Sequence, residues 1–331
     1  FHAEDGIRDS VASRGLGDVY KRQLFVVSCD DDNDNDPQCC VGNSIVDLAS
    51  QTESLSTLVA ALQATGLDAA LTGEGPYTVL APTNDAFDAL LVSLNATSLD
   101  DIPVDVLTNV LLNHVITGEV LSSSLTNGYA NTQATSNASG TNMSIYINTD
   151  SGVTFNGVSN VITADVTASN GVVHIVDSVI GLPSVVTFAL ADPNFDILVQ
   201  ALTREDLTQD FVGLLSTPVG SPSPFTVFAP INSGFVNLLA ELGVESLADI
   251  NEPTLAAVLS YHVITEANQL SVNLSGGMEF TTAQGGNLLF NFNDIGGGVL
   301  TDNNERTSNI VAVDVQADNG IIHAIDTVVL P

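Results

Sequence analysis

The sequence predicts a mixed α+β protein built from two copies of one domain, each an antiparallel β-sandwich or barrel flanked by short helices. Three blocks of sequence occur twice in the same order, at spacings of 148, 148 and 149 residues. The blocks are residues 77–87 and 225–235, 113–117 and 261–265, and 170–177 and 319–326. This period exceeds the roughly 20–50 residues of solenoid repeats, so each copy is long enough to fold around its own core.

Each copy begins with an amphipathic helix. Apolar residues recur at positions i, i+3, i+4 and i+7, which places them on one face of a helix. These residues are Leu55, Leu58, Val59 and Leu62 in the first copy and Phe195, Leu198, Val199 and Leu202 in the second. A further helix is expected over residues 102–112 and 250–260. The rest of each copy is rich in Val, Ile, Thr, Asn and Gly with frequent turn signals, which indicates antiparallel strands.

The first repeated block predicts a short buried strand followed by a helix. Residues 78–81 and 226–229 are apolar apart from their threonines, and a proline ends each run. Asn84 and Asn232 then stand where an N-cap belongs, because an asparagine side chain can accept hydrogen bonds from free amides of the first helical turn. Three residues later, Phe87 and Phe235 are expected to point into the core.

The repeats set the domain boundaries at residues 44–183 and 184–331, joined by a short linker. Residues 1–23 contain four of the six basic residues of the chain and have no place in either repeat. They resemble translated sequencing-adaptor read-through, although a natural disordered N-terminus is the alternative. Residues 24–43 are interpreted as the remnant of a lipoprotein signal followed by an acidic tether.

The charge of the chain is strongly acidic. Its 39 Asp and Glu residues against 6 Lys and Arg residues give a formal net charge of -33. Such a surface repels phosphate backbones and anionic headgroups, which excludes nucleic-acid binding. It keeps the protein in solution and suits a salty exterior, where ions screen charges over about 10 Å or less.

Residues 24–29 resemble the lipobox of bacterial envelope lipoproteins, in which the cysteine is acylated and becomes the mature N-terminus. This resemblance implies that Cys29 carries a lipid anchor, and the acidic run behind it is similar to signals for the outer cell surface. The other cysteines, Cys39 and Cys40, are neighbours, and a disulfide between adjacent residues is strained. A disulfide framework and cysteine redox chemistry are therefore not expected.

The acidic run also has a calcium interpretation, because Asp32, Asp34 and Asp36 alternate like the first ligands of an EF-hand loop. That loop needs a glycine at its sixth position and a glutamate at its twelfth. Pro37 and Asn43 occupy these positions, so a solvated tether is the preferred interpretation. We expect no metal site and no cofactor.

The repeated blocks resemble the fasciclin domain family over residues 44–331. The motif residues of this resemblance are Thr78, Asn84, Phe87, His174 and Asp177 in the first copy and Thr226, Asn232, Phe235, His323 and Asp326 in the second. The Tyr-His element of the family is matched by Tyr261-His262, whereas the first copy has Asn113 before His114. The resemblance implies a wedge-shaped β-sandwich flanked by helices, found in extracellular and surface-anchored adhesion or matrix proteins.

The repeated histidines admit a metal or catalytic interpretation and a structural one. Along a strand, alternate residues share a face, so Asp177 and Asp326 point away from His174 and His323. A local His-carboxylate ligand pair is therefore disfavoured. Buried histidines bonded to backbone groups explain the duplication equally well.

The Tyr-His element has been proposed as an adhesion epitope in the family. The resemblance therefore implies a tentative binding role for Tyr261 and His262, with His114 at the equivalent position. The alternative is that Tyr261 is a core aromatic residue with its hydroxyl hydrogen-bonded. Asp165 and Asp314 are interpreted as turn or edge carboxylates rather than catalytic acids.

The chain contains no nucleophile elbow, phosphate loop, dinucleotide fingerprint or zinc-protease helix. We therefore expect a non-catalytic adhesion or matrix-interaction module, lipid-anchored on the outer face of a bacterial outer membrane. Its partner is expected to be a surface or matrix protein or a polysaccharide. A glycan or small-molecule site in a cleft near His114 or His262 is the alternative, and a histidine-dependent enzyme is a weaker one.

Overall fold

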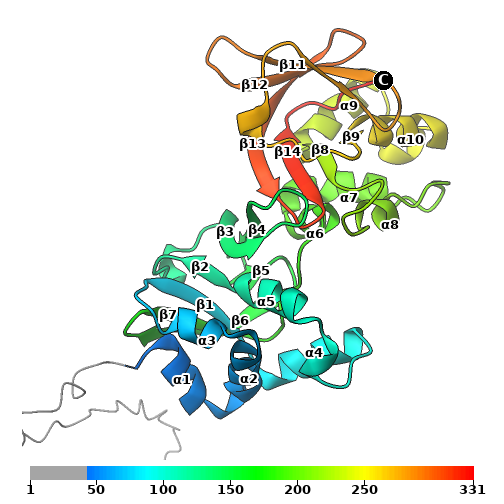
Figure 1. Ribbon diagram of the computed structural model, residues 1–331. Helices are drawn as coiled ribbons and strands as arrows, with labels where there is room; N and C mark the ends of the chain where they lie inside the picture. Colours follow the sequence, from blue (N-terminus) through cyan, green and yellow to red (C-terminus); the bar gives the residue numbers. More distant parts are fainter. Residues whose placement is uncertain (1–42) are drawn as a thin grey trace, which may run out of the picture. The chain divides into compact units, whose positions relative to one another are not determined.

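The computed structural model describes residues 43–331, and the two repeats contain the same elements in the same order (Figure 1). The first repeat consists of α1 (Ile45–Gln51), α2 (Ser56–Thr65), α3 (Leu67–Leu71), β1 (Tyr77–Pro82), α4 (Asn84–Ser93), α5 (Val104–Leu112), β2 (Val115–Thr117), β3 (Gly128–Thr135), β4 (Asn142–Asn148), β5 (Thr154–Phe155), β6 (Ser159–Ala168) and β7 (Gly171–Val176). The proposed adaptor segment, Cys29, the acidic run and the other cysteines lie outside the described residues.

The second repeat follows the same plan. It consists of α6 (Val185–Ala191), α7 (Asp196–Leu202), α8 (Phe211–Leu215), β8 (Phe225–Pro230), α9 (Asn232–Leu242), α10 (Glu252–Tyr261), β9 (Val263–Ile264), β10 (Met278–Thr281), β11 (Asn287–Phe292), β12 (Gly298–Thr301), β13 (Thr307–Gln316) and β14 (Gly320–Ile325). The helices expected around residues 55–62, 102–112 and their counterparts are present as α2, α5, α7 and α10, with boundaries shifted by a few residues.

The strands of both repeats have one cyclic order. In the first repeat, β1 to β7 close into a barrel in chain order. In the second, the order β10-β11-β12-β13-β14-β8-β9 is the same cycle, opened between β9 and β10. The mixed α+β class is therefore confirmed. The structure adds one parallel pair per repeat, β1 with β7 and β8 with β14, which the turn pattern did not reveal.

Each repeat has two apolar clusters, one under the helices and one inside the strands. In the first repeat the helical cluster includes Leu58, Leu62 and Phe87, and the strand cluster includes Leu80 and Phe155. The second repeat has the same division. The apolar stripes that predicted the helices are thus the faces that these helices bury.

The N-cap prediction for Asn84 and Asn232 was wrong, because each begins its helix rather than preceding it. Asn84 instead accepts a hydrogen bond from the amide of Thr57 at 2.9 Å and donates to the carbonyl of Glu53 at 3.0 Å. Asn232 makes the equivalent bonds to Ile197 and Pro193 in the second repeat. Each asparagine therefore holds the start of the preceding long helix, α2 or α7, against the helix that follows the buried strand.

The N-cap of α4 is Thr83, whose hydroxyl accepts from the amide of Ala86 at 3.3 Å. Thr83→Ala is expected to lower the free energy of unfolding of the first repeat by about 1 kcal/mol, because that amide loses its partner. Urea denaturation followed by circular dichroism measures this change. The counterpart, Ile231, makes no side-chain cap, so Ile231→Thr is the complementary variant and is expected to stabilise α9. If neither variant changes the urea concentration at the midpoint of unfolding, the assignment of Thr83 as the N-cap of α4 is wrong.

No single helix among residues 43–331 has both the length and the apolar character needed to cross a membrane. One pair bent by 96°, Val185–Ala191 with Pro193–Leu202, meets the length and composition requirement only when its two parts are taken together.

Candidate functional site

His114 and His262 lie in the interior just after α5 and α10. In each, Nδ1 donates to the carbonyl four residues earlier, Val110 or Val258, at 2.7 Å. Each Nε2 accepts a backbone amide, from Ile180 at 2.9 Å or Val329 at 3.2 Å. A carbonyl can only accept and an amide can only donate, so these partners select the neutral tautomer with hydrogen on Nδ1. Burial lowers the pKa of both histidines to about 4.

His174 and His323, on the last strand of each barrel, have the opposite tautomer. Their Nε2 atoms donate to the carbonyls of Val120 at 2.9 Å and Gln269 at 2.8 Å. Their Nδ1 atoms accept the amides of Asp165 at 3.2 Å and Asp314 at 3.4 Å. Both side chains have no solvent exposure, and burial lowers the pKa of His323.

Asp165 and Asp314 are residues of strand irregularities, with φ near +60°, in β6 and β13. The carboxylate of Asp165 accepts from the amide and hydroxyl of Ser122, and that of Asp314 accepts from the same two groups of Ser271. A carboxylate oxygen of Asp165 lies 3.9 Å from Nδ1 of His174. Because that nitrogen already accepts an amide hydrogen, the pair is arranged to fix the strand rather than to transfer a proton.

All four repeated histidines therefore use both ring nitrogens on backbone groups. None has a lone pair free to bind a metal or to take a proton from a substrate. Within residues 43–331, no cluster of three or more His, Cys, Asp or Glu side chains is arranged to hold a metal ion. The geometry supports the structural interpretation of these histidines.

The residues of the tentative adhesion motif are buried. Tyr261 has no solvent exposure, and His262 and His114 retain 4% and 1%. The hydroxyl of Tyr261 donates to the carbonyl of Asn287 at 2.5 Å and accepts the amide of Asn303 at 3.3 Å. A partner that binds the folded surface cannot reach these side chains, so the surface-epitope interpretation is corrected to one of core packing.

The first repeat replaces the tyrosine with an amide network. Asn113, also without solvent exposure, donates to the carbonyl of Gly181 at 3.0 Å and accepts from the hydroxyl of Thr132 at 3.1 Å. This departure from the Tyr-His pattern therefore keeps a polar, hydrogen-bonded side chain at the same buried position.

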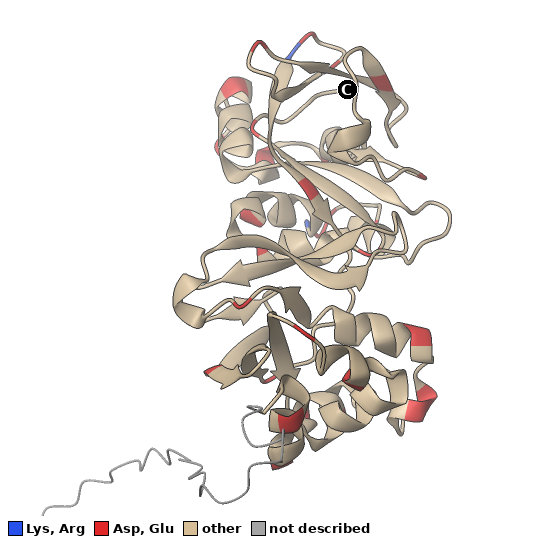
Figure 2. Cartoon of the chain, turned by 60° about the vertical axis from the view of Figure 1, so that its left-hand side comes forward, with Lys and Arg blue, Asp and Glu red and all other residues tan. Residues whose placement is uncertain are grey.

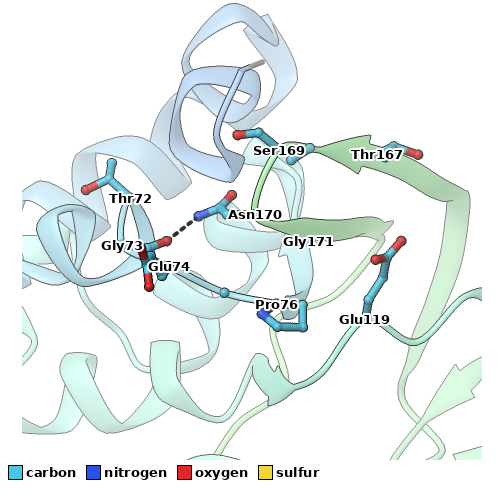
Figure 3. Close-up of a pocket in the computed structure, with 11 residues that line it drawn as sticks. Thr72, Gly73, Glu74, Pro76, Glu119, Thr167, Ser169, Asn170 and Gly171 are labelled. Atoms are coloured by element: carbon cyan, nitrogen blue, oxygen red, sulfur yellow. Dashed lines mark hydrogen bonds between the residues drawn. The ribbon is translucent and has the colours of Figure 1, made fainter. Parts of the chain in front are cut away.

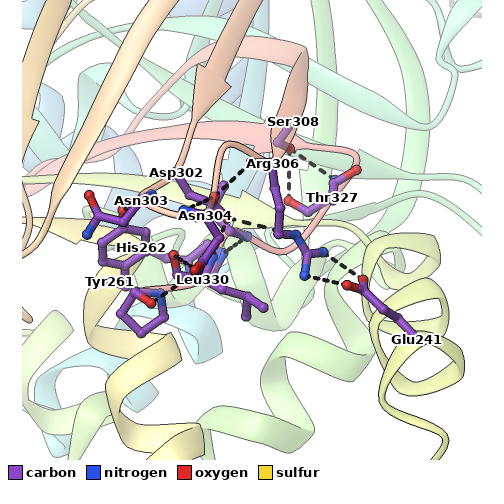
Figure 4. A network of polar contacts seen from close by, with 12 residues as sticks. Glu241, Tyr261, His262, Asp302, Asn303, Asn304, Arg306, Ser308, Thr327 and Leu330 are labelled. Atoms are coloured by element: carbon purple, nitrogen blue, oxygen red, sulfur yellow. Dashed lines mark hydrogen bonds and ion pairs between the residues drawn. The ribbon is translucent and has the colours of Figure 1, made fainter.

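The Tyr-His element of the second repeat adjoins a polar network around Asp302 (Figure 4). The carboxylate of Asp302 accepts the amides of Asn304, Arg306 and Leu330, each at 2.9 Å. The guanidinium of Arg306 extends from this turn to Glu241 on α9, at 3.0 Å. These bonds join a tight turn, the last residues of the chain and a helix, which is a structural rather than a catalytic arrangement.

The remaining motif residues are also structural. The hydroxyl of Thr78 donates to the carbonyl of Gly118 and accepts the amide of Val120, and Thr226 makes the equivalent pair. Phe87 and Phe235 are core residues, as expected. Asp177 and Asp326 bind the backbone and side-chain amides of Asn160 and Asn309 on the neighbouring strands.

One pair of residues in the closing block has a larger structural role than its sequence suggested. Asn170 accepts the first amide of α1, from Ile45, and donates to the carbonyls of Leu71 and Gly73. Asn319 makes the equivalent three bonds, to Val185, Leu215 and Thr217. The recurrence of Asn-Gly at the same place in both copies was the only sequence signal of this function.

Acidic residues are spread over both repeats, and basic residues are rare (Figure 2). No lysine or arginine occurs between residues 23 and 203. Arg204 binds Asp206 and donates to the carbonyls of Leu247 and Ile250. Its guanidinium is therefore already bonded within the protein, as is that of Arg306. The described surface therefore offers positively charged or cation-bridged partners an almost unopposed negative field.

A hollow of about 570 Å³ in the first repeat is lined mainly by backbone and short polar side chains (Figure 3). Glu74 and Glu119 contribute carboxylates, and Asn170 binds the carbonyl of Gly73 at its edge. No large apolar side chain lines it, so it does not resemble the apolar clefts that bury most of a small-molecule ligand. Among residues 43–331, neither His114 nor His262 lines this hollow or any of four further cavities, which argues against the ligand cleft expected near those histidines.

The two repeats contact each other within one compact unit. Ser136 and Asn137, in the turn after β3, bind Asp318, and the hydroxyl of Ser144 accepts the amide of Gln316. Tyr146 of the first repeat packs into the helical core of the second. The two interiors are thus less independent than the duplication suggested.

Comparisons with known proteins agree with this architecture. A family model for the fasciclin domain matches residues 53–183 and 193–331. The chain is 39% identical over 137 residues to protein sll1483 of Synechocystis sp., covering 41% of this chain and 72% of that protein. It is 30% identical over 195 residues to the transforming growth factor-beta-induced protein ig-h3 of Sus scrofa, covering 59% of this chain but 27% of that protein.

A solved FAS1 domain pair from the insect cell adhesion molecule fasciclin I has the same fold. The TM-score is 0.50 at 21% identity, and the match covers 84% of this chain and 97% of that chain. At this identity the likeness concerns the fold alone. Taken with the duplicated motifs and the shared strand order, the family match over most of the sequence shows that this chain belongs to the fasciclin domain family, as a tandem pair of such domains.

Proposed function

We propose that this protein is a non-catalytic adhesion module that binds a surface or matrix partner, either a protein or a polysaccharide. Fasciclin domains occur in cell adhesion and matrix proteins, among the relatives ig-h3 and periostin. The observation that carries the proposal is the state of the four repeated histidines, whose ring nitrogens are all bonded to the backbone. A catalytic site needs a free base or nucleophile, and these histidines supply neither. Their bonded state therefore favours a binding function over a catalytic one.

We place the binding function on the exterior of the domains rather than on the buried Tyr-His element. Because the surface is acidic and its two arginines are committed, cationic groups of a partner or bridging divalent cations are the expected contacts. We further propose that Cys29 is acylated and anchors the chain to the outer face of a bacterial outer membrane. Mass spectrometry of the native N-terminus tests this anchoring.

The adhesion proposal predicts salt-sensitive binding of the whole chain to cells, polysaccharide or matrix proteins. Surface-plasmon resonance with the immobilised chain is expected to show binding that weakens as salt rises from about 0.05 to 0.5 M, because ions screen exposed charges. Tyr261→Phe, which removes only a buried hydroxyl, serves as the control and should bind like the native protein once its fold is verified. A folded protein that binds none of these surfaces contradicts the proposal.

A further inference from the structure

A cavity of about 330 Å³ lies where the first repeat meets the second. Its walls include Tyr129 and Tyr146 of the first repeat and Asp192, Phe195 and Val315 of the second. The lining is mostly apolar, with a few polar groups that converge on one carboxylate. Its size is at the lower end of cavities that bind small molecules.

Asp192 provides that carboxylate, and its side chain is almost entirely buried at 4% exposure. One oxygen accepts the hydroxyl of Tyr129 at 2.9 Å, and the other accepts the backbone and side-chain amides of Asn194 at 3.0 and 2.9 Å. Tyr146 lines the same cavity, and burial together with the charge of Asp192 raises the pKa of this tyrosine to about 12. These three hydrogen bonds occupy most of the acceptor positions of the carboxylate, which has about four.

The negative charge of Asp192 has no cationic partner among the described residues. The first repeat contains no lysine or arginine, and the two arginines of the second are bound to other carboxylates and carbonyls. A buried charge without a counter-charge is costly even when it is hydrogen-bonded. A cation in the cavity would therefore gain more from Asp192 than from an exposed carboxylate.

Aromatic rings form the wall beside this charge. The ring centroids of Tyr129 and Tyr146 are 5.0 Å apart with the planes inclined at 60°. Phe188, which is not a lining residue, packs edge-on against Tyr129 at 5.6 Å. Ring faces carry negative electrostatic potential and attract cations, most strongly where water is excluded. Carboxylate and rings thus favour the same kind of ligand.

We propose that this cavity binds the methylated ammonium group of a small organic cation. A primary ammonium group must donate about three hydrogen bonds, and the carboxylate has about one acceptor position left for them. A quaternary methylammonium has no N–H and needs no acceptor, because ring faces and the field of Asp192 hold its charge and apolar walls hold its methyl groups. The class of ligand follows from this combination of a largely hydrogen-bonded carboxylate and an unbalanced charge.

The site is particular to the junction and is not a repeated feature of the domain. Thr52 occupies the position equivalent to Asp192, 140 residues earlier, and Met278 that of Tyr129, 149 residues later. The same fold therefore forms without these groups, so the fold does not require a carboxylate or a tyrosine here.

Calorimetric titration of the whole chain with choline tests the proposal, with 3,3-dimethyl-1-butanol as the neutral ligand of the same shape. Saturable binding of choline is expected, with the neutral compound at least about tenfold weaker, because only the charge differs. Equal affinity for the two compounds, or no saturable binding of choline, overturns the proposal. This comparison uses the native chain and is independent of any variant.

Asp192→Asn and Tyr129→Leu are each expected to weaken choline binding about tenfold or more, since one removes the counter-charge and the other removes a ring. Asp88→Asn is the matched control, because it removes one exposed carboxylate from α4, away from the cavity, and should leave the affinity within about twofold. Circular dichroism verifies that each variant is folded. If the folded Asp192→Asn variant binds choline as tightly as the native chain, the carboxylate does not hold the ligand and the proposal is wrong.

Discussion

Asn319→Ala is expected to lower the free energy of unfolding of the second repeat by about 3–5 kcal/mol. The alanine loses three hydrogen bonds at once, an acceptor for the amide of Val185 and donors to the carbonyls of Leu215 and Thr217. Asn319 is 2% exposed, so water cannot replace these bonds without opening the structure. Chemical denaturation followed by circular dichroism gives the change in free energy.

Two comparisons separate this effect from a general cost of replacing asparagine. Asn131→Ala, at an exposed position of β3, should change the stability by no more than about 0.5 kcal/mol. Asn170→Ala should also destabilise the first repeat, but by less than Asn319→Ala destabilises the second, because Asn170 makes the same three bonds from a half-buried position that water can reach. A loss below about 1 kcal/mol for Asn319→Ala would show that these bonds do not hold α6 and α8 together.

The free energy of unfolding is expected to fall steeply as the pH is lowered from about 6.5 to 4. Burial lowers the pKa of His114 and His262 from 6.5 to about 4, so between these values the unfolded chain binds protons that the folded chain excludes. The stabilisation is therefore complete above pH 6.5 and is lost as the pH falls towards 4. Each pH unit below 6.5 lowers the free energy of unfolding by about 1.4 kcal/mol per histidine. At pH 4 the two histidines together have lowered it by about 6 kcal/mol.

Urea titrations at pH 7.5, 6, 5 and 4 measure this dependence, with high salt added to screen the repulsion among carboxylates. Protonation of carboxylates lowers the free energy of unfolding only at lower pH. For example, hydrogen bonds from Thr97 and Ser98 hold the pKa of Asp101 below its usual value, and its contribution is lost only as the pH falls through that lowered pKa. Proton NMR gives the direct control, since the ring signals of His114 and His262 should not shift between pH 8 and 5.5. Titration of either signal near 6.5 would refute the buried, neutral assignment.

Local patterns predicted most of the fold correctly. The apolar stripe at Leu55, Leu58 and Leu62 predicted α2 because an amphipathic helix depends on the spacing of its own residues. The strand before Pro82 was evident for the same reason. The parallel pairing of β1 with β7 was not, because its partners are about 94 residues apart and periodicity carries no information on which strands become neighbours.

The roles of polar side chains were harder to predict. Asn84 has the composition of an N-cap, but its partners, Thr57 and Glu53, are about 30 residues earlier in the chain. The buried state of Tyr261 and His262 depends on Asn287, Val329 and other residues that approach only in the folded barrel. The carboxylate of Asp192 gave no signal in the sequence, because its partner Tyr129 belongs to the other repeat.

The duplication, the family, the mixed α+β class and the acidic character of this protein follow from the sequence, since each depends on residue identity and spacing along the chain. Three features became known only from the folded arrangement: the repeated histidines are neutral and fully hydrogen-bonded, the Tyr-His element is inside, and a charged cavity forms where the repeats meet. Tautomer, burial and electrostatic field depend on groups that folding brings within a few ångströms of one another. Distances along the chain do not contain that information.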